Sequence, residues 1–260
     1  MSENIKTRVQ QQFGAAAADY AASEVHARGE SLGVLLELAA PQPTWRVLDV
    51  ATGAGHTALT FAPRVAEVVA TDLTVRMLQQ TAQAAAARGL TNVRTAVGDA
   101  EAIPFPDGSF DAVTCRLAFH HFPAPDRAAA EMARVLRPGG VLGFTDNHVV
   151  EDPAADAFYN AFEKLRDPSH VRVRPVPELR SLFAAAGLTV TAERRLTKEF
   201  EFHSWADRQR VAPADKERLL EMLRTVPPAL TPLLSPRFAD GTAYFTLWEV
   251  VLVGRRAGPA

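Results

Sequence analysis

Hydrophobic positions recur along the chain with two different periods, and their order predicts a mixed α/β fold. Between residues 45 and 146, five short apolar runs are predicted to be strands: "WRVLDV", "EVVATD", "NVRTAVGD", "FDAVTCR" and "VLGFTD". Most segments between them have helical spacing, as at Val75, Leu78, Ala82 and Ala85. Apolar strands separated by helices predict a parallel sheet that is covered by helices on both faces.

Two further apolar runs follow, "LTVTAERRLTKEFEF" and "YFTLWEVVLVGRR". They predict a C-terminal pair of strands, the last of them antiparallel, which brings the sheet to seven strands. Three mainly helical segments lie outside the alternating pattern, at 1–40, 147–175 and 203–240.

Composition narrows the class of partner. The 260 residues carry a formal net charge of -2 and no long basic run, which weighs against a nucleic-acid partner. Cys115 is the only cysteine, so an intrachain disulfide is excluded and a reducing compartment is expected. No apolar run approaches the ~20 residues of a membrane span, and the first residues are polar. We expect a soluble, cytoplasmic protein with no membrane partner, and the sequence does not indicate its oligomeric state.

The stretch "VLDVATGAGHTA" (47–58) joins the first strand to a helix through a loop of small residues. Residues 53–58 fit the G-x-G-x-x-[G/A] pattern of dinucleotide-binding loops. Asp49, Ala51, Gly53 and Gly55 also fit the D-x-G-x-G-x-G loop of S-adenosylmethionine (SAM) enzymes, with alanine at the first glycine. In both cases small residues let the backbone approach a ligand at a helix N-terminus, so the loop alone leaves both ligands open.

Carboxylates at the ends of three predicted strands favour the second ligand. Asp49 precedes the glycines, where a carboxylate suits an ammonium or sulfonium group and opposes a pyrophosphate. Asp72 follows the second strand and can bind both ribose hydroxyls. Asp99 follows the third strand, where it could accept a hydrogen bond from an adenine amino group, with the Ala100 N–H toward a ring nitrogen. Together they predict a pocket for an adenosyl group with a cationic tail.

The ordered motifs resemble those of class I SAM-dependent methyltransferases, most closely the small-molecule group that includes the ubiquinone/menaquinone C-methyltransferases. In order they are "VLDVATGAGH", "VVATD", "GDAEAIPFPDGSFD", "HHF" and "EMARVLRPGG". The resemblance covers 47–144 closely and the rest of the chain in outline. It implies an α/β fold with a Rossmann-like seven-stranded sheet, mostly parallel with the last strand antiparallel, and helical lid insertions. It also implies SAM as the methyl donor and S-adenosylhomocysteine (SAH) as the product.

The resemblance assigns roles to residues that follow each strand, and an aromatic lid residue, Tyr20 or Phe13, that closes over the cofactor. The predicted cofactor-binding residues are Tyr20, Asp49, Ala51, Thr52, Gly53, Gly55, Asp72, Leu73, Asp99, Ala100, Cys115 and Arg116. The resemblance places Cys115 and Arg116 where the backbone meets the amino-acid end of the cofactor. For the Cys115 side chain, a buried apolar role is favoured over a redox or nucleophilic thiol. We expect one methyltransferase domain over 1–260, in which 1–40 forms the lid, 45–146 the cofactor-binding core, and 147–175 and 203–240 the substrate side. A helix merely packed on the sheet is the alternative for the lid.

The pair His120 and His121, in "FHHF" (119–122), supplies the catalytic candidates. The pair follows the fourth strand, at the carboxyl edge where ligands lie in such sheets. A general base is needed only if the acceptor is a hydroxyl or an acidic carbon. Because the two residues are consecutive, we expect at most one to face the acceptor; packing is the alternative for both.

Three other sets of residues leave alternatives open. His148 and His170 could join Asp146 and the histidine pair near one edge, but no metal-ligand spacing occurs, so we expect no metal. Phe158, Tyr159 and Phe162 could wall an apolar pocket or pack in the core, and Trp205 could cap it. Arg166, Arg172 and Arg174 could bind an acidic acceptor or remain solvated. The alternative functions are a SAM-binding cyclase or non-methylating protein of the same fold and, less favoured, an NAD(P)-dependent oxidoreductase.

Overall fold

The computed structural model describes residues 2–21, 29–239 and 241–258, with the side chains of the first helix described at 5–14 and 17. Its helices are α1 (Ser2–Ala21), α3 (Glu30–Ala39), α4 (His56–Phe61), α5 (Val75–Ala87), α6 (Pro125–Val135), α7 (Pro153–Arg166), α8 (Val176–Ala185), α9 (Phe202–Asp207), α10 (Pro213–Arg224) and α11 (Thr231–Leu234), with 3-10 turns η1 (Ala62–Arg64) and η2 (Phe119–His121). Its strands are β1 (Arg46–Val50), β2 (Glu67–Asp72), β3 (Val93–Val97), β4 (Phe110–Arg116), β5 (Leu136–Val149), β6 (Arg174–Pro175), β7 (Leu188–Glu201), β8 (Arg237–Ala239) and β9 (Thr242–Arg256). None of the helices in these ranges is both long and apolar enough to cross a membrane.

The main sheet has the strand order β3-β2-β1-β4-β5-β9-β7. Strands β1 to β5 pair in parallel, and β9 is antiparallel to both of its neighbours. This confirms the predicted seven-stranded, mostly parallel sheet with an antiparallel last strand. Two short strands, β6 and β8, extend it on β5 and β9 and were not predicted, because two or three residues are too few to show a period. The order reverses between β1 and β4, and ligands bind at the carboxyl ends of the strands at such a reversal.

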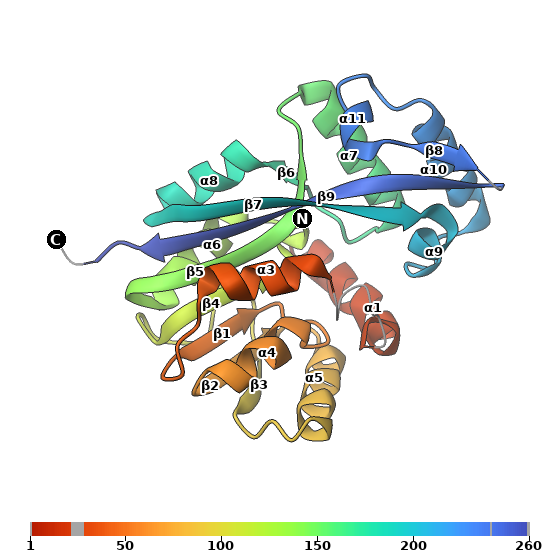
Figure 1. Cartoon of the computed structure of the whole chain (residues 1–260). Helices are drawn as coiled ribbons and strands as arrows, with labels where there is room; N and C mark the ends of the chain where they lie inside the picture. Colours follow the sequence, from red (N-terminus) through yellow and green to blue (C-terminus); the bar gives the residue numbers. More distant parts are fainter. Residues whose placement is uncertain (1, 22–28, 240, 259–260) are drawn as a thin grey trace.

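The two faces of the sheet bury separate cores, as the period of two along each strand requires. Val47 packs with Leu35 of α3 on one face, while the next residue, Leu48, packs with Met132 of α6 and Phe183 of α8 on the other. All five side chains are fully buried. Helices therefore cover both faces (Figure 1), as predicted.

A third core lies at the far end of the long strands β7 and β9. There α7, α9, α10 and α11 gather around the extended ends of both strands (Figure 1). Phe162 of α7 stacks on Trp205 of α9 at 5.0 Å, and Phe245 of β9 meets Trp205 edge-on at 4.9 Å. Tyr159 and Phe162 are fully buried in this core, so they have the packing role. The segments 147–175 and 203–240 thus form one cap on a shared pair of strands.

The helices of the segment 1–40 have two different positions. Helix α3 packs on the sheet so closely that a Cβ atom added at Gly143 of β5 would lie 3.0 Å from Leu35. Helix α1 instead crosses the carboxyl ends of the strands, where the Gln10 side chain donates a hydrogen bond to the Leu73 carbonyl at 3.0 Å. Helix α1, the part of the predicted lid that the structure describes, thus lies over the strand ends, while α3 packs on a face of the sheet.

The loop between β1 and α4 needs a left-handed backbone at every second residue. Ala51, Gly53 and Gly55 have φ values of 51°, 54° and 85°. Alanine at the first position therefore stands where glycine is favoured, and its Cβ costs about 1–2 kcal/mol. Gly55 has a further constraint, because a Cβ there would lie 2.6 Å from Thr81 Cγ2, whereas one at Gly53 meets nothing within 4 Å.

Alanine substitutions at these two glycines should separate the backbone cost from the steric cost. Gly53→Ala is expected to lower the free energy of unfolding by about 1–2 kcal/mol, the cost of a left-handed alanine. Gly55→Ala should lose about 1–3 kcal/mol more, because the methyl group overlaps Thr81. Urea denaturation of both variants measures the difference. Equal losses in the two variants would contradict the close contact.

Candidate active site

A cavity opens at the carboxyl ends of β1, β2 and β4, under helix α1 and beside the cap. Its walls come from the loop after β1, the ends of the neighbouring strands, and α7, α9 and β7. The predicted residues that line it are Asp49, Ala51, Thr52, Gly53, Asp72, Leu73, Asp99, Ala100, Arg116, His120 and His121. Predicted site residues from a stretch of 73 positions, Asp49 to His121, thus line the same cavity.

Asp49 is the most deeply buried carboxylate of this cavity, with 1% of its surface exposed. Its Oδ2 accepts hydrogen bonds from the Thr52 hydroxyl at 2.5 Å and the Ala58 N–H at 3.2 Å, and its Oδ1 from the Thr114 hydroxyl at 2.6 Å. Burial raises the pKa of Asp49 to about 6, against the opposing effect of these bonds and of Arg116. A buried carboxylate of this kind favours a cationic neighbour.

Asp72 closes the glycine loop from the end of β2. Its Oδ2 accepts a hydrogen bond from the Gly53 N–H at 2.9 Å and its Oδ1 from the Thr74 N–H at 2.8 Å. Burial raises the pKa of Asp72 as well. A carboxylate has about four lone-pair sites, so each oxygen retains capacity for one more donor, such as a ribose hydroxyl.

Asp99 is joined to helix α1. Its Oδ2 accepts a hydrogen bond from the Lys6 ammonium at 2.7 Å and its Oδ1 from the Glu101 N–H at 2.9 Å. Lys6 also contacts the Glu101 carboxylate at 2.5 Å. The sequence did not predict this lysine, which lies 93 positions from Asp99. Helix α1 is therefore tied to the side of the cavity where adenine was predicted.

Three of the predicted cofactor-binding residues are not among the described residues that line the cavity. The Cys115 side chain is fully buried in the sheet core, where burial raises the pKa of its thiol well above the usual value, so the apolar role describes it. Gly55 begins α4 behind the loop. Tyr20 lies on α1, and its side chain is outside the described residues. Phe13 of the same helix lines the cavity and contacts the His121 ring edge-on at 5.0 Å.

His120 and Asp146 form a buried dyad beside the cavity. Asp146, at the end of β5, binds His120 twice: its Oδ1 lies 2.6 Å from the imidazole Nδ1, and its Oδ2 accepts a hydrogen bond from the backbone N–H at 2.9 Å. Burial alone would lower the pKa of His120, but Asp146, with Glu163 and Asp167, outweighs it and raises that pKa. A carboxylate on Nδ1 fixes the proton there and leaves Nε2 as the basic nitrogen.

His121 has the opposite environment. Burial and the neighbouring His120 lower its pKa to about 4, so it is neutral at pH 7. Its Nδ1 lies 3.3 Å from both the Ser169 carbonyl and the Ser169 hydroxyl. Because that hydroxyl donates to Asp167 at 2.6 Å, the proton of this contact resides on His121. Of the two predicted histidines, His120 has the charged partner that a base requires.

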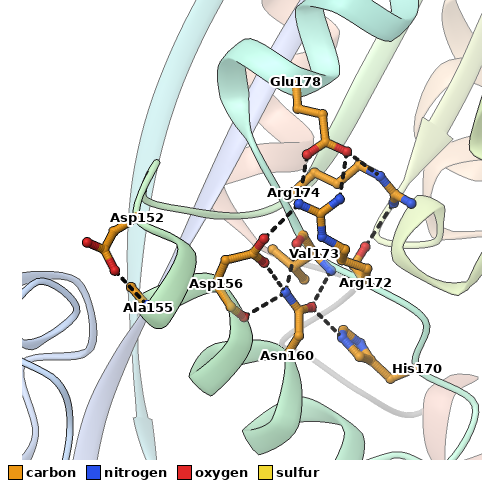
Figure 2. A network of polar contacts seen from close by, with 9 residues as sticks. All are labelled: Asp152, Ala155, Asp156, Asn160, His170, Arg172, Val173, Arg174 and Glu178. Carbon is orange, nitrogen blue, oxygen red and sulfur yellow. Dashed lines mark hydrogen bonds and ion pairs between the residues drawn. The ribbon is translucent and has the colours of Figure 1, made fainter.

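A polar network holds the segment after α7 in place (Figure 2). Asn160 is its centre: the amide oxygen accepts from the Val173 N–H at 2.7 Å and lies 2.9 Å from His170 Nε2. The proton of that contact is on His170, because the amide oxygen can only accept. The segment then reaches η2, where the Val171 and Arg172 N–H groups donate to the His120 carbonyl at 2.9 and 3.0 Å.

The three arginines for which an acidic acceptor and a solvated face were the alternatives have different surroundings. Arg172 is bound to Asp156 at 2.7 Å and to Glu178 at 2.8 Å, and Arg174 to Glu178 at 3.2 Å (Figure 2). Both belong to the network and not to the cavity wall. Arg166 does line the cavity, with its guanidinium 4.3 Å from the centre of the Trp205 ring.

The sequence did not identify the cavity residues of the long C-terminal strands. The cavity is also lined by Lys198 and Phe200 of β7, Arg208 after α9, and Glu249 of β9. Lys198 and Phe200 lie on the half-buried face of β7, two residues apart. The sequence held one signal for these residues, namely a lysine at an inward-facing position of a predicted strand. Within the ranges that the structure describes, no group of three His, Cys, Asp or Glu residues is arranged to hold a metal ion.

Comparisons with known proteins agree with this geometry. Residues 48–144 match the family model "Methyltransferase domain". The chain is 41% identical over 199 residues to the uncharacterized methyltransferase YcgJ of Bacillus subtilis, covering 76% of this chain and 78% of that protein. It is 37% identical over 183 residues to a demethylmenaquinone methyltransferase of Thermus thermophilus, covering 61% of this chain and 80% of that enzyme. The crystal structure of YcgJ superposes with a TM-score of 0.84 over 88% of this chain and 99% of that one.

Sequence, strand order and solved structure agree. The chain belongs to the class I methyltransferases.

Proposed function

We propose that the protein transfers a methyl group from SAM to an ionisable atom of a small metabolite, with His120 as the general base. SAM is proposed as the donor because Asp49, Asp72 and Asp99 line one cavity together with the glycine loop. The observation that carries the base is the 2.6 Å contact between His120 and Asp146.

The residues of the cavity fit SAM. The left-handed backbone at Ala51 and Gly53 leaves room for a close approach of the cofactor. Asp72 would hold the ribose, Asp99 with the Ala100 N–H would hold the adenine edge, and Asp49 would face the cationic methionine end. An NAD(P) pyrophosphate would instead have to lie beside the buried Asp49 carboxylate, which opposes it.

When bound, SAM supplies an electrophilic methyl group on a sulfonium, so the chain has to align the acceptor, exclude water and remove one proton. His120 Nε2 would take that proton, and Asp146 would stabilise the imidazolium that results. The raised pKa of His120 suits a hydroxyl or an acidic carbon as the acceptor. His121, which is neutral, would only hold the neighbouring His120 imidazole in position.

Ligand-induced stabilisation tests the donor. SAH at a hundredfold excess over its Kd should raise the free energy of unfolding by about 2.7 kcal/mol, and NADH should not. Asp72→Asn should weaken SAH binding about tenfold or more, because a charged acceptor is lost. Scanning fluorimetry measures both, with Asp126→Asn on the exposed side of α6 as the matched control. Stabilisation by NADH in place of SAH would reject the proposal.

The pH dependence of SAM affinity tests the role of Asp49. With a pKa of about 6, Asp49 is ionised to about 97% at pH 7.5 and to about 10% at pH 5. Since only the carboxylate attracts the cationic methionine end, SAM affinity should fall about tenfold over this range. Asp49→Asn should bind weakly at both pH values and lose most of this slope. A wild-type affinity that does not change between pH 7.5 and pH 5, measured by calorimetry, would contradict the contact.

A matched pair of alanine variants tests the base. His120→Ala should lower transfer of the tritiated methyl group to a metabolite extract about 100-fold, on the scale of lost general-base catalysis. His121→Ala should lower it less than about fivefold, and both variants should bind SAH as the wild type does. In the wild type the rate should rise with pH through a midpoint above 6.5, and Asp146→Asn should move that midpoint down.

Two results would overturn this assignment. Losses of less than about fivefold in both histidine variants would exclude base catalysis by the pair. SAH binding without any label transfer would favour the non-methylating alternative of the same fold.

A further inference from the structure

One face of helix α1 forms part of the cavity wall. Lys6, Val9 and Phe13 line the cavity, and their spacing of three and four residues places them on the same side of the helix. Phe13 contacts the His121 ring, whereas Lys6 reaches Asp99, which follows β3. A ligand that fills this cavity therefore lies against α1.

Helix α1 is attached to the rest of the protein by a small apolar cluster and by single polar contacts. The cluster consists of Phe13, Ala17, Ala54 and Met77, and it is separate from the cores of the sheet. The Gln10 side chain adds an exposed hydrogen bond to the Leu73 carbonyl at 3.0 Å. An element with little buried apolar surface opens locally at a lower free energy than the core of a sheet does.

Lys6 supplies an ionic contact between α1 and the edge of the cavity. Its ammonium lies 2.7 Å from Asp99 Oδ2 and 2.5 Å from Glu101 Oε2. Burial lowers the pKa of Lys6, but its hydrogen bonds with the two carboxylates outweigh this effect and raise it, so the ammonium is charged at neutral pH. Glu101 is itself buried, and its Oε1 accepts a hydrogen bond from the Ala124 N–H at 2.7 Å. The ion pair thus fastens α1 to a fixed point at the start of α6.

Asp99 takes part both in this contact and in the proposed adenine site. Its Oδ1 accepts a hydrogen bond from the Glu101 N–H at 2.9 Å, and its Oδ2 accepts one from Lys6. A carboxylate has about four lone-pair sites, so Asp99 can accept the adenine amino group without releasing Lys6. The side chains of Lys6 and Asp99 are 25% and 28% exposed, so salt can screen the pair.

We propose that Lys6 is a positioning residue of the cofactor site, whose ion pair with Asp99 and Glu101 holds α1 over the bound cofactor. SAM and SAH are then exchanged when this pair opens and α1 moves away from the strand ends. The inference rests on the proposed function for the identity of the ligand, and it adds a residue that controls the rate of ligand exchange.

The rate of cofactor release tests this role. Tritiated SAM is bound without any acceptor and then chased with unlabelled SAH. Lys6→Met should release the label about tenfold faster than the wild type, because hydrogen bonds to charged groups that hold α1 closed are lost. Raising the salt from about 0.05 M to about 0.5 M should speed release from the wild type about threefold, and release from Lys6→Met should not respond.

Two further variants separate the ion pair from other properties of the helix. Lys6→Arg keeps the positive charge and should retain slow, salt-dependent release. Arg8→Met removes an exposed cation from the same helix and should release the label as the wild type does.

Amide hydrogen exchange without ligand provides a second readout. In the free protein, Lys6→Met should speed exchange in α1 about tenfold and leave exchange in α3 unchanged, since only α1 depends on the pair. Lys6→Arg should resemble the wild type. This comparison also identifies a variant that has failed to fold, because exchange in α3 would then rise as well.

Three results would overturn the inference: wild-type release rates in Lys6→Met, fast release in Lys6→Arg, or α1 exchange that Lys6→Met does not change. A wild-type protein that binds neither SAM nor SAH would overturn the proposed function instead. Exchange in α1 then still decides whether Lys6 holds the helix over the cavity.

Discussion

The buried carboxylate of Asp49 is the interaction on which the site depends. Its three hydrogen bonds join the end of β1 to the glycine loop through Thr52, to α4 through the Ala58 N–H, and to β4 through Thr114. The carboxylate therefore sets the shape of the loop and also supplies the charge that a cationic ligand would meet. Burial raises the pKa of Asp49 to about 6, because burying the carboxylate charge costs free energy that a cationic neighbour would offset.

The part of the cavity wall beside the cap depends on two long strands. β7 and β9 have 14 and 15 residues, and their outer ends carry the cap. The same pair of strands therefore packs against α3 and α8 at one end and presents Lys198 and Phe200 to the cavity at the other. The glycine loop and the cap are therefore attached to different parts of one continuous sheet.

The sequence was sufficient to predict that the residues around the glycine loop meet, because they directly follow strands whose order can be predicted. Asp49, Asp72 and Asp99 each stand at such a position, and parallel strands bring their carboxyl ends to one edge. The positive φ of Ala51 likewise falls where the motif has glycine. Phe13, on the predicted lid, also lines the cavity.

The contacts of helix α1 could not be predicted in the same way. The contact of Lys6 with Asp99 spans 93 positions, and that of Gln12 with Gln209 spans 197. Neither has a local pattern, because long-range packing of helices on the sheet sets both. For Arg172 and Arg174 the sequence left an acidic acceptor or a solvated face open, and the structure instead pairs them with Asp156 and Glu178.

A crystal structure of the protein with SAH tests the central claim most directly. The account predicts the ribose hydroxyls on Asp72, the adenine amino group on Asp99, and the amino-acid end beside Asp49 and Arg116. The sulfur should then lie between the glycine loop and His120. Density for SAH at any other site, or with the adenosyl group against Lys198 and Arg208, would contradict the account.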